Sequence, residues 1–196
     1  MITVSAVASR DDTDARTTAL ALDAGRGDRR ALESFIRETQ RDVWRFVAHL
    51  GSVAAADDLT QETYLRAIKS LPRFAAQSSA RTWLLSIARR VVVDQVRAAM
   101  ARPRIAGGVD WMAAADTAHT RSASSSYEDV VEVTLLLGAL PAERREALVL
   151  TQVLGLSYEE AAQICGCPIG TVRSRVARAR ENLIEATRAD HRRDLG

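Results

Sequence analysis

The 196-residue chain has little cysteine, lysine, aromatic side chain or long apolar sequence, and each scarcity excludes a class of protein. Its two cysteines, Cys165 and Cys167, stand one residue apart, and a disulfide across that spacing would be strained. Two thiolates cannot complete a structural zinc site, and the three histidines are remote in sequence. We therefore interpret both cysteines as packing residues of a turn, and we expect no metal and no cofactor.

Apolar runs are short. None approaches the length of about 18 residues that a membrane-spanning helix needs, and the N-terminus lacks the hydrophobic centre of a secretory signal. Both absences favour a cytoplasmic protein without a membrane span. Aromatic residues make up 5% of the chain while Ala, Leu and Val dominate, which favours helices packed by aliphatic side chains.

Lys69 is the one lysine among 27 basic residues. Arginine suits phosphate and base-edge contacts, although a GC-rich genome would produce the same bias. The net charge is −1 over residues 1–70, +5 over 71–126, −5 over 127–167 and +3 over 168–196. Two basic regions, each behind an acidic one, suggest two contacts with nucleic acid. We also hypothesise that stretches 71–126 and 127–167 pair in the free protein, which would hide DNA-binding surfaces.

Residues 156–184 predict a helix-turn-helix. Ser157 and Glu160 form a capping box at the start of a short helix. Gly166 ends that helix and Pro168 cannot continue it. A longer basic helix then starts near Gly170 or Thr171.

The basic helix has two faces. Val172, Val176, Ala179 and Leu183 fall on one narrow apolar stripe. Arginines separated by small residues project on the other side, which is the layout of a helix that reads duplex DNA. The alternative interpretation is a solvated, Arg-rich helix that closes a bundle. The candidate DNA contacts are Thr171, Arg173, Ser174, Arg175, Ala177 and Arg178.

Three amphipathic helices are predicted before the middle of the chain, at 31–50, 54–71 and 80–100. The second presents an acidic face with Leu65 at its centre, which suits a basic helical partner or is an ordinary solvated face. The third exposes Trp83 beside arginines, a pattern typical of single-stranded nucleic-acid binding. The alternative there is that Trp83 covers the core and Arg90 pairs with Asp94.

Residues 101–126 contain Pro103, Gly107–Gly108 and a serine run, and about 26 residues is too long for a loop inside a compact domain. We therefore expect a linker there, with no role assigned to its Trp111. The predicted organisation is a disordered tail at 1–16, a helical domain at 17–100, the linker at 101–126, a helical domain at 127–188 and a tail at 189–196.

The order of these segments resembles the extracytoplasmic-function (ECF) class of bacterial sigma factors. The resemblance spans about residues 28–186 and rests on DDLTQETYLRAI, PRF, SARTWLLSIARRVVVDQVR and LPAERREALVLTQVLGLSYEEAAQICGCPIGTVRSRVARARENL. It implies an all-α fold of two small helical domains, sigma region 2 and sigma region 4 with its helix-turn-helix, joined by a flexible linker. It also implies no covalent chemistry and no small-molecule substrate.

The resemblance assigns partners to the three surfaces. Region 4 would dock on the β flap of RNA polymerase and read the −35 element as duplex, through the candidates on the basic helix. Region 2 would bind the β′ clamp helices and hold a flipped base of the −10 element, which costs a few kcal/mol of unstacking. An anti-sigma factor is a further candidate partner. The implied polymerase contacts are Asp57, Asp58, Gln61, Glu62 and Leu65. The implied −10 contacts are Phe74, Gln77, Ser78, Trp83, Ser86, Arg89, Arg90 and Arg97.

Some features depart from the family pattern. ECF members commonly carry Asn within the stretch that reads Ile87-Ala88-Arg89-Arg90 here, and some carry a larger residue at Ala177. The alternative function is a helix-turn-helix response regulator, but residues 54–97 lack the β–α alternation of a receiver domain. An enzyme is disfavoured because no His/Glu or metal-ligand cluster is present in the sequence pattern.

Overall fold

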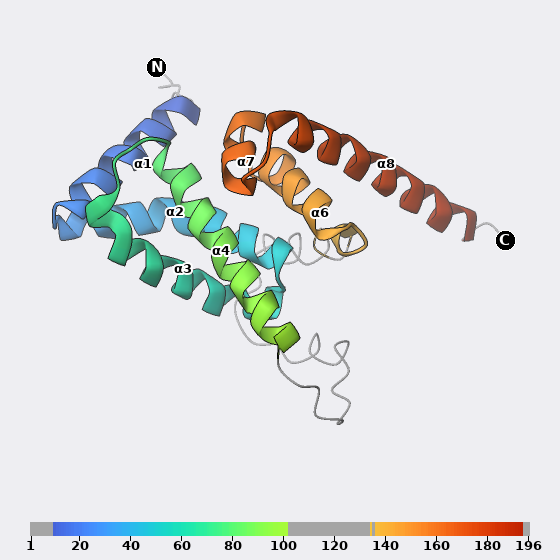
Figure 1. The fold of residues 1–196 in the computed structure, drawn as a ribbon, viewed down its shortest axis with the longest axis horizontal. Helices are drawn as coiled ribbons and strands as arrows, with labels where there is room; N and C mark the ends of the chain where they lie inside the picture. The colour runs from blue at the N-terminus through green and yellow to red at the C-terminus, as the bar shows by residue number, and fades with distance from the viewer. Residues whose placement is uncertain (1–9, 102–133, 135, 194–196) are drawn as a thin grey trace, which may run out of the picture.

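The computed structural model describes residues 10–101, 134 and 136–193, with side chains through Glu185. Over these residues the chain forms helices and no strand, which confirms the all-α prediction. Figure 1 shows α1 to α4 grouped on one side of the molecule and α6 to α8 on the other. None of the described helices combines the length and the apolar character that crossing a membrane requires.

Four helices form the N-terminal half: α1 (Arg10–Gly25), α2 (Arg29–Leu50), α3 (Ala56–Ser70) and α4 (Ala80–Ala101). Short 3₁₀ turns, η1 (Val53–Ala55) and η2 (Leu71–Arg73), flank α3. The carboxylate of Asp28 caps α2 by accepting from the backbone N–H groups of Arg30 at 2.8 Å and Ala31 at 3.1 Å. Helix α2 packs on α1, α3 and α4 and so lies at the centre of this half.

The core of the N-terminal half is aliphatic and aromatic. Phe35, Phe46, Leu84 and Leu85 are among its fully buried side chains. Burying side chains of this size contributes about 1.5–3 kcal/mol each. The core therefore fixes α4 against α2 and sets which side of α4 faces outward.

The C-terminal half contains α6 (Ala142–Leu148), the π-helical turn η4 (Val149–Val153), α7 (Tyr158–Cys165) and α8 (Ile169–Arg193). The predicted capping box at the start of α7 is present, with Ser157 and Glu160 satisfying each other's backbone N–H groups. Gly166 ends α7 in the left-handed conformation (φ 64°), which glycine adopts without steric cost. The predicted helix-turn-helix is therefore confirmed as a local structure.

The structure differs from the predicted helix limits in several places. α1 begins at Arg10 rather than near Thr17, and α8 runs to Arg193, well beyond Leu183. Val96 is 41% exposed, because the end of α4 projects past the helices that pack on it (Figure 1). The predicted linker and the first residues of the domain predicted at 127–188 lie outside the described residues.

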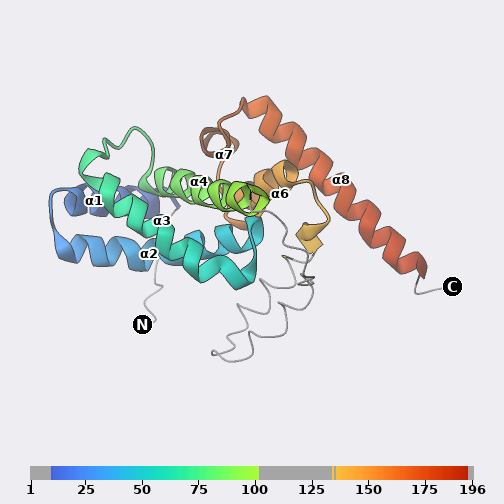
Figure 2. The same ribbon diagram turned by 60° about the horizontal axis from the view of Figure 1, so that its bottom comes forward.

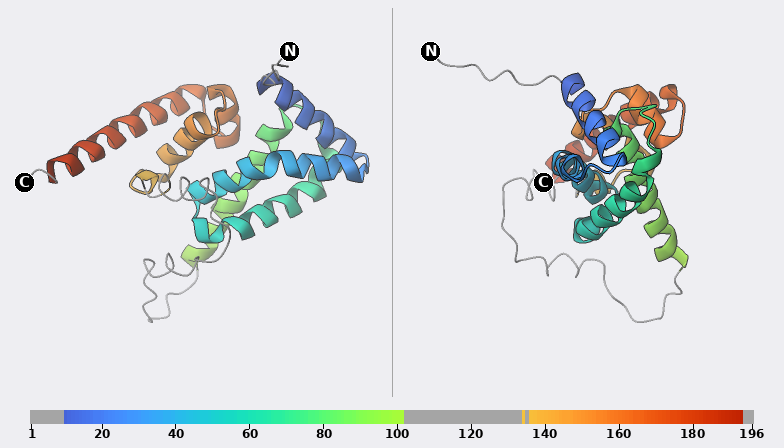
Figure 3. Two further views of the ribbon diagram at one scale, coloured as in Figure 1. Left: turned by 180° about the vertical axis from the view of Figure 1, so that it is seen from behind. Right: turned by 90° about the vertical axis from the view of Figure 1, so that its left-hand side faces the viewer.

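The two halves are in contact. α7 packs against α4, and α6 packs against α2. Figures 2 and 3 show from three further directions that α4 lies along the C-terminal half, with the end of α2 beside α6. One flank of α4 therefore faces α6 and α7. We call the whole contact between the two halves the seam.

Candidate nucleic-acid interface

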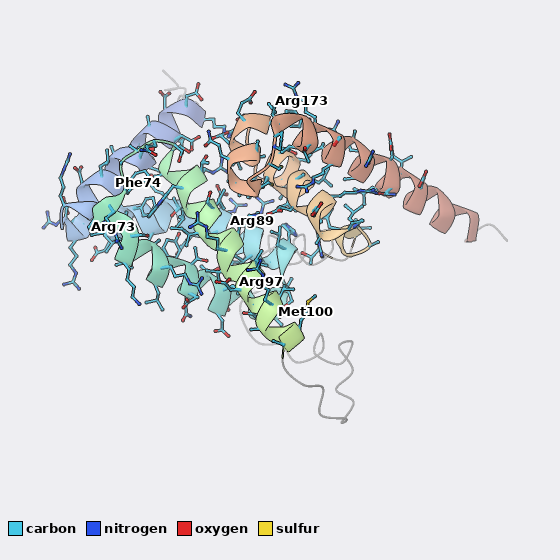
Figure 4. The ribbon with its side chains drawn as sticks, viewed as in Figure 1. Arg73, Phe74, Arg89, Arg97, Met100 and Arg173 are labelled. Carbon is cyan, nitrogen blue, oxygen red and sulfur yellow. The ribbon has the colours of Figure 1, made fainter. Side chains whose placement is uncertain are left out.

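Helix α8 presents the predicted pair of faces. Val172, Val176 and Ala179 are at most 1% exposed and pack toward α6 and α7. Four projecting candidates, Arg173, Ser174, Ala177 and Arg178, are exposed. The guanidinium of Arg173 lies 5.8 Å from the ring centroid of Tyr158, a cation–π contact that holds the side chain over the outer surface of α7. Figure 4 places Arg173 at the outer edge of the molecule, away from the seam.

Two candidates on α8 are placed differently. Arg175 turns inward and donates to the Glu143 carboxylate at 2.6 Å and to Cys167 Sγ at 3.6 Å. Thr171 is half-buried, and its backbone carbonyl accepts from Ser174 Oγ at 2.9 Å. The geometry therefore gives Arg175 a packing role between α6, α8 and the turn.

Phe74 of the loop between η2 and α4 pairs with Trp83 in the first turn of α4. The rings of Phe74 and Trp83 are 4.8 Å apart between centroids and inclined at 40°, and both side chains are half-buried. Trp83 therefore rests on Phe74 and the core rather than standing fully in solvent. Ser79 caps α4, since its Oγ accepts from the Thr82 N–H at 3.1 Å. Ser78 is half-buried and Gln77 is exposed at the tip of the loop.

A shallow hollow of about 460 Å³ lies between this loop and α1. Its lining includes Ala76, which has a positive φ of 51°, a rare conformation for a residue other than glycine. Strained backbone of this kind concentrates at ligand-holding loops. The lining also includes Thr18, Leu22, Ser78 and Ser79.

The remaining −10 candidates follow α4. Arg90 and Arg97 are exposed, and Ser86 is half-buried and donates to the Thr82 carbonyl at 2.9 Å. The alternative pairing of Arg90 with Asp94 is absent, because Asp94 accepts from Arg66 of α3 at 2.6 Å. Figure 4 shows Arg89, Arg97 and Met100 in sequence along α4.

Arg89 differs from the other candidates because it points into the seam. Its guanidinium donates to both carboxylate oxygens of Glu146, at 2.5 and 3.3 Å, and Glu146 is only 6% exposed. Burial by itself would lower the pKa of Arg89, but the hydrogen bond and charge of Glu146 outweigh it and raise that pKa. In this arrangement Arg89 is not available to DNA.

Further hydrogen bonds join the two halves near the first turns of α4 and α1. Arg81 donates to the Leu154 carbonyl at 2.7 Å and to Asp42 at 2.7 Å. Arg10 in the first turn of α1 donates to the Gly155 carbonyl and, at 2.5 Å, to Glu160. Glu160 also accepts from Thr82 Oγ1 at 3.3 Å, so the capping residue of α7 binds α1 and α4 as well.

His49 lies at the other end of the seam. Its ring is 1% exposed, and Nδ1 is 2.7 Å from Oγ1 of Thr134, a residue of the C-terminal half. Burial, aided by the charge of Arg45, lowers the pKa of His49 to about 4. Nε2 of His49 and Nε of Arg45 are buried without a hydrogen-bond partner. The buried polar groups at this end of the seam therefore make fewer hydrogen bonds than those at the end that contains Arg89.

The predicted polymerase-binding face lies on the outer side of α3. Asp58, Gln61 and Leu65 are exposed, and Leu65 reaches 56%. Glu62 is half-exposed and accepts from Arg66 at 2.7 Å. Asp57 is exposed and accepts from the Trp44 indole N–H at 2.9 Å. Neither Asp58 nor Glu62 is buried, which an outward-facing pair requires.

Both cysteines are free thiols, Cys165 buried and Cys167 half-buried, at the turn that precedes α8. Burial raises the pKa of Cys165 to about 12. Within the described residues no cluster of His, Cys, Asp and Glu forms a metal site.

Comparisons with known proteins identify the family. Residues 35–102 match Sigma-70 region 2, and residues 131–183 match Sigma-70, region 4. The ECF RNA polymerase sigma factor SigC of Mycobacterium tuberculosis and the probable RNA polymerase sigma-C factor of Mycobacterium bovis are each 55% identical over 189 residues, covering 95% of this chain and 98% of the relative. The ECF RNA polymerase sigma factor EcfG of Rhodopseudomonas palustris is 36% identical over 146 residues, covering 74% of this chain and 78% of EcfG. The chain therefore belongs to the ECF class of the sigma-70 family of RNA polymerase sigma factors.

Solved structures agree. CnrH in complex with the cytosolic domain of CnrY matches with a TM-score of 0.69 and 25% identity, covering 89% of this chain and 99% of CnrH. The sigma factor RpoE in complex with the anti-sigma factor NepR from Bartonella quintana matches with a TM-score of 0.62 and 28% identity, covering 81% and 98%. The predicted family and two-domain sigma fold are confirmed, and the response-regulator alternative is not supported.

Proposed function

We propose that this chain binds core RNA polymerase and directs it to promoters through two separate DNA contacts. The observation that carries the proposal is the presence, in one sigma-family chain, of two arginine-bearing helices on different halves and an acidic face on α3. The chain performs no covalent step in this account. Because its proposed partner is RNA polymerase, we place it in the cytoplasm.

The −35 contact is assigned to α8. Arg173 and Arg178 are exposed on a helix whose opposite stripe is buried, so the helix can enter a major groove without losing its own packing. Ser174 and Ala177 lie between these two arginines, and their small side chains allow the helix backbone to approach the base edges closely. We assign Arg175 to positioning rather than to DNA, because Glu143 already binds it.

The −10 contact is assigned to α4 and the loop before it. The hollow beside Ala76 and Ser78 offers a place for an unstacked base, and the Phe74–Trp83 pair, from the same loop and the start of α4, offers an aromatic surface. Arg90 and Arg97 are exposed for strand phosphates. Holding a base outside the stack supports local opening of the duplex.

The polymerase contact is assigned to the acidic face of α3, against the β′ clamp helices, with region 4 on the β flap. An anti-sigma factor is a second proposed partner, since the solved relative RpoE is bound to one. The seam supports a further proposal. In the free chain Glu146 binds Arg89 and Glu160 binds Thr82, so neither α4 side chain can contact DNA. Binding to the polymerase would separate the halves and expose the −10 surface.

Reconstituted transcription tests the proposal. Core polymerase with this chain should initiate at defined sites on DNA recovered by selection from a randomised promoter library. Replacing Asp58 and Glu62 by Arg should abolish initiation and co-purification with core while leaving duplex binding through α8 intact. No defined initiation by the unmodified chain, together with no association with core, would overturn the proposal.

A further inference from the structure

A second exposed basic surface lies at the end of the N-terminal half, beside the −10 loop. It comprises Arg26, Arg29 and Arg30 at the turn between α1 and α2, and Arg73 at the end of η2. We call these four residues the basic end. None of them belongs to the three surfaces assigned above.

A close backbone contact brings the two segments together. A Cβ atom on Gly25 would lie 2.6 Å from the Leu71 carbonyl oxygen, so only glycine lets the α1–α2 turn rest directly on η2. Gly27 then reverses the chain with a φ of 100°. Figure 4 shows Arg73 at this end of the molecule, next to Phe74 of the loop.

Asp23, Asp28 and Glu33 lie beside the four arginines and leave a local net charge of +1, so the basic end depends on the arginines that those carboxylates do not bind. Arg30 and Arg73 are exposed, and neither side chain has a hydrogen-bond or ion-pair partner among residues 10–101 and the other described parts. Arg26 meets Asp23 at 2.9 Å and Arg29 meets Glu33 at 3.8 Å, but these two arginines are 75% and 90% exposed. Exposed pairs of this kind contribute at most about 1 kcal/mol and are screened by salt. Asp28 is already used as the cap of α2.

The seam arginines provide the contrast. Arg81 and Arg89 are 15% and 30% exposed, and each is bound by a carboxylate of the protein. The guanidinium groups of the basic end are left to solvent or to an external anion. Arg73 immediately precedes Phe74, so an anion bound there would adjoin the proposed site of the unstacked base.

We propose that the basic end binds the phosphate backbone of the promoter strand next to the bases held by loop 74–79. The proposal rests on the proposed function, because the loop must first hold that strand. None of its four residues offers an aromatic ring on which an unpaired base could stack, which favours contacts with phosphates. It therefore adds affinity and salt dependence without adding sequence preference.

The test compares two charge-matched double variants in the complete holoenzyme. The first is Arg30→Ala with Arg73→Ala, and the control is Arg37→Ala with Arg41→Ala, which removes two exposed charges from the middle of α2. The probe is a selected promoter fragment whose −10 region is single-stranded, and affinity is measured over a series of salt concentrations. The slope of log affinity against log salt should decrease by about 1.4 in the first variant, at about 0.7 per single-strand phosphate contact. The control slope should match that of the unmodified chain.

Further outcomes separate this inference from the function on which it rests. Shortening the strand beyond the bases held by the loop should remove the difference between the unmodified chain and the first variant. Equal salt-dependence slopes for the two double variants, or an altered base preference in the first variant, would overturn the inference. The proposed function would still stand if the unmodified holoenzyme initiates transcription. A holoenzyme that fails to initiate at all would contradict the proposed function itself.

Discussion

Helices α4 and α8 have similar sequences in outline, yet their arginines lie in different environments. Each helix has a buried aliphatic stripe and arginines on the other side. On α8, Arg173 and Arg178 face outward, whereas on α4, Arg89 is bound by Glu146 of the opposite half. The difference comes from the Glu146 carboxylate on α6, not from the sequence pattern of either helix.

This difference implies an order for the two proposed DNA contacts: the −35 contact can form first, and the −10 contact forms after the halves separate. The proposed −35 surface on α8 is exposed while the halves are packed together. The proposed −10 surface is exposed only in part, because Arg90 and Arg97 face solvent while Arg89 and Thr82 bind carboxylates across the seam. Opening the seam would then convert a duplex-binding protein into one that also binds the melted strand.

The largest effect is expected from a charge placed in the buried stripe of α8. Val176→Asp should cost several kcal/mol of folding free energy, since the residue is 1% exposed and no cation lies in its stripe. Thermal unfolding followed by circular dichroism measures the loss. Ala177→Asp is the matched control one residue later: it should leave the melting curve nearly unchanged but abolish binding to the −35 duplex. Equal destabilisation by both substitutions would contradict the two-faced helix.

Removing one projecting arginine should have a smaller effect and should fall on binding alone. Arg173→Ala should lose about 1–3 kcal/mol on the preferred −35 duplex if it reads a base. Titrations against the preferred sequence and a scrambled sequence measure it. A loss of the same size on every duplex would make Arg173 a phosphate contact. Arg175→Ala should instead lower stability modestly, because it removes a half-buried side chain that packs beside Cys167 and α6.

Neutralising one seam carboxylate tests whether α4 is masked. Glu146→Gln keeps the shape but weakens the pair with Arg89, which should favour the open state by about 1.4 kcal/mol. The free variant should then bind the −10 single strand up to about tenfold more tightly. Its affinity for the −35 duplex should stay the same. An unchanged −10 affinity would argue that the seam does not limit this contact.

The smallest effect is expected from pH, through His49. Its pKa is about 4 in the folded protein, below the ordinary value of 6.5, so the folded state favours the neutral ring. Its contribution to stability is therefore complete above pH 6.5 and is lost as the pH falls toward 4, by at most about 1.4 kcal/mol per pH unit. Urea unfolding at pH 7.5 and 5.5 measures the change, and His49→Gln should flatten it. The same pH dependence in His49→Gln would assign it to other groups.

The sequence was sufficient for features governed by local periodicity and caps. The capping box at Ser157, the left-handed Gly166 and the buried stripe of α8 all follow from short-range rules, and the structure contains each. The family assignment followed because two blocks occur at a fixed spacing. Both were readable without any knowledge of how the halves pack.

Contacts between segments far apart in sequence could not be predicted from periodicity and capping rules. The charges of residues 71–126 and 127–167 suggested pairing, but nothing local indicated that Arg89 meets Glu146 or that Arg10 meets Glu160. Asp94 was paired with Arg90 by helical spacing, whereas the structure pairs it with Arg66 of the neighbouring helix. Trp83 was expected either in solvent or covering the core, and a helical wheel cannot show that it packs on Phe74.

The most direct test of the account measures both DNA contacts with the free chain and with the holoenzyme. Fluorescence anisotropy would follow binding to a selected −35 duplex and to the matching −10 single strand. The account predicts that the free chain binds the duplex but scarcely binds the single strand, and that the holoenzyme binds both. A free chain that binds the −10 strand as tightly as the holoenzyme does would contradict it.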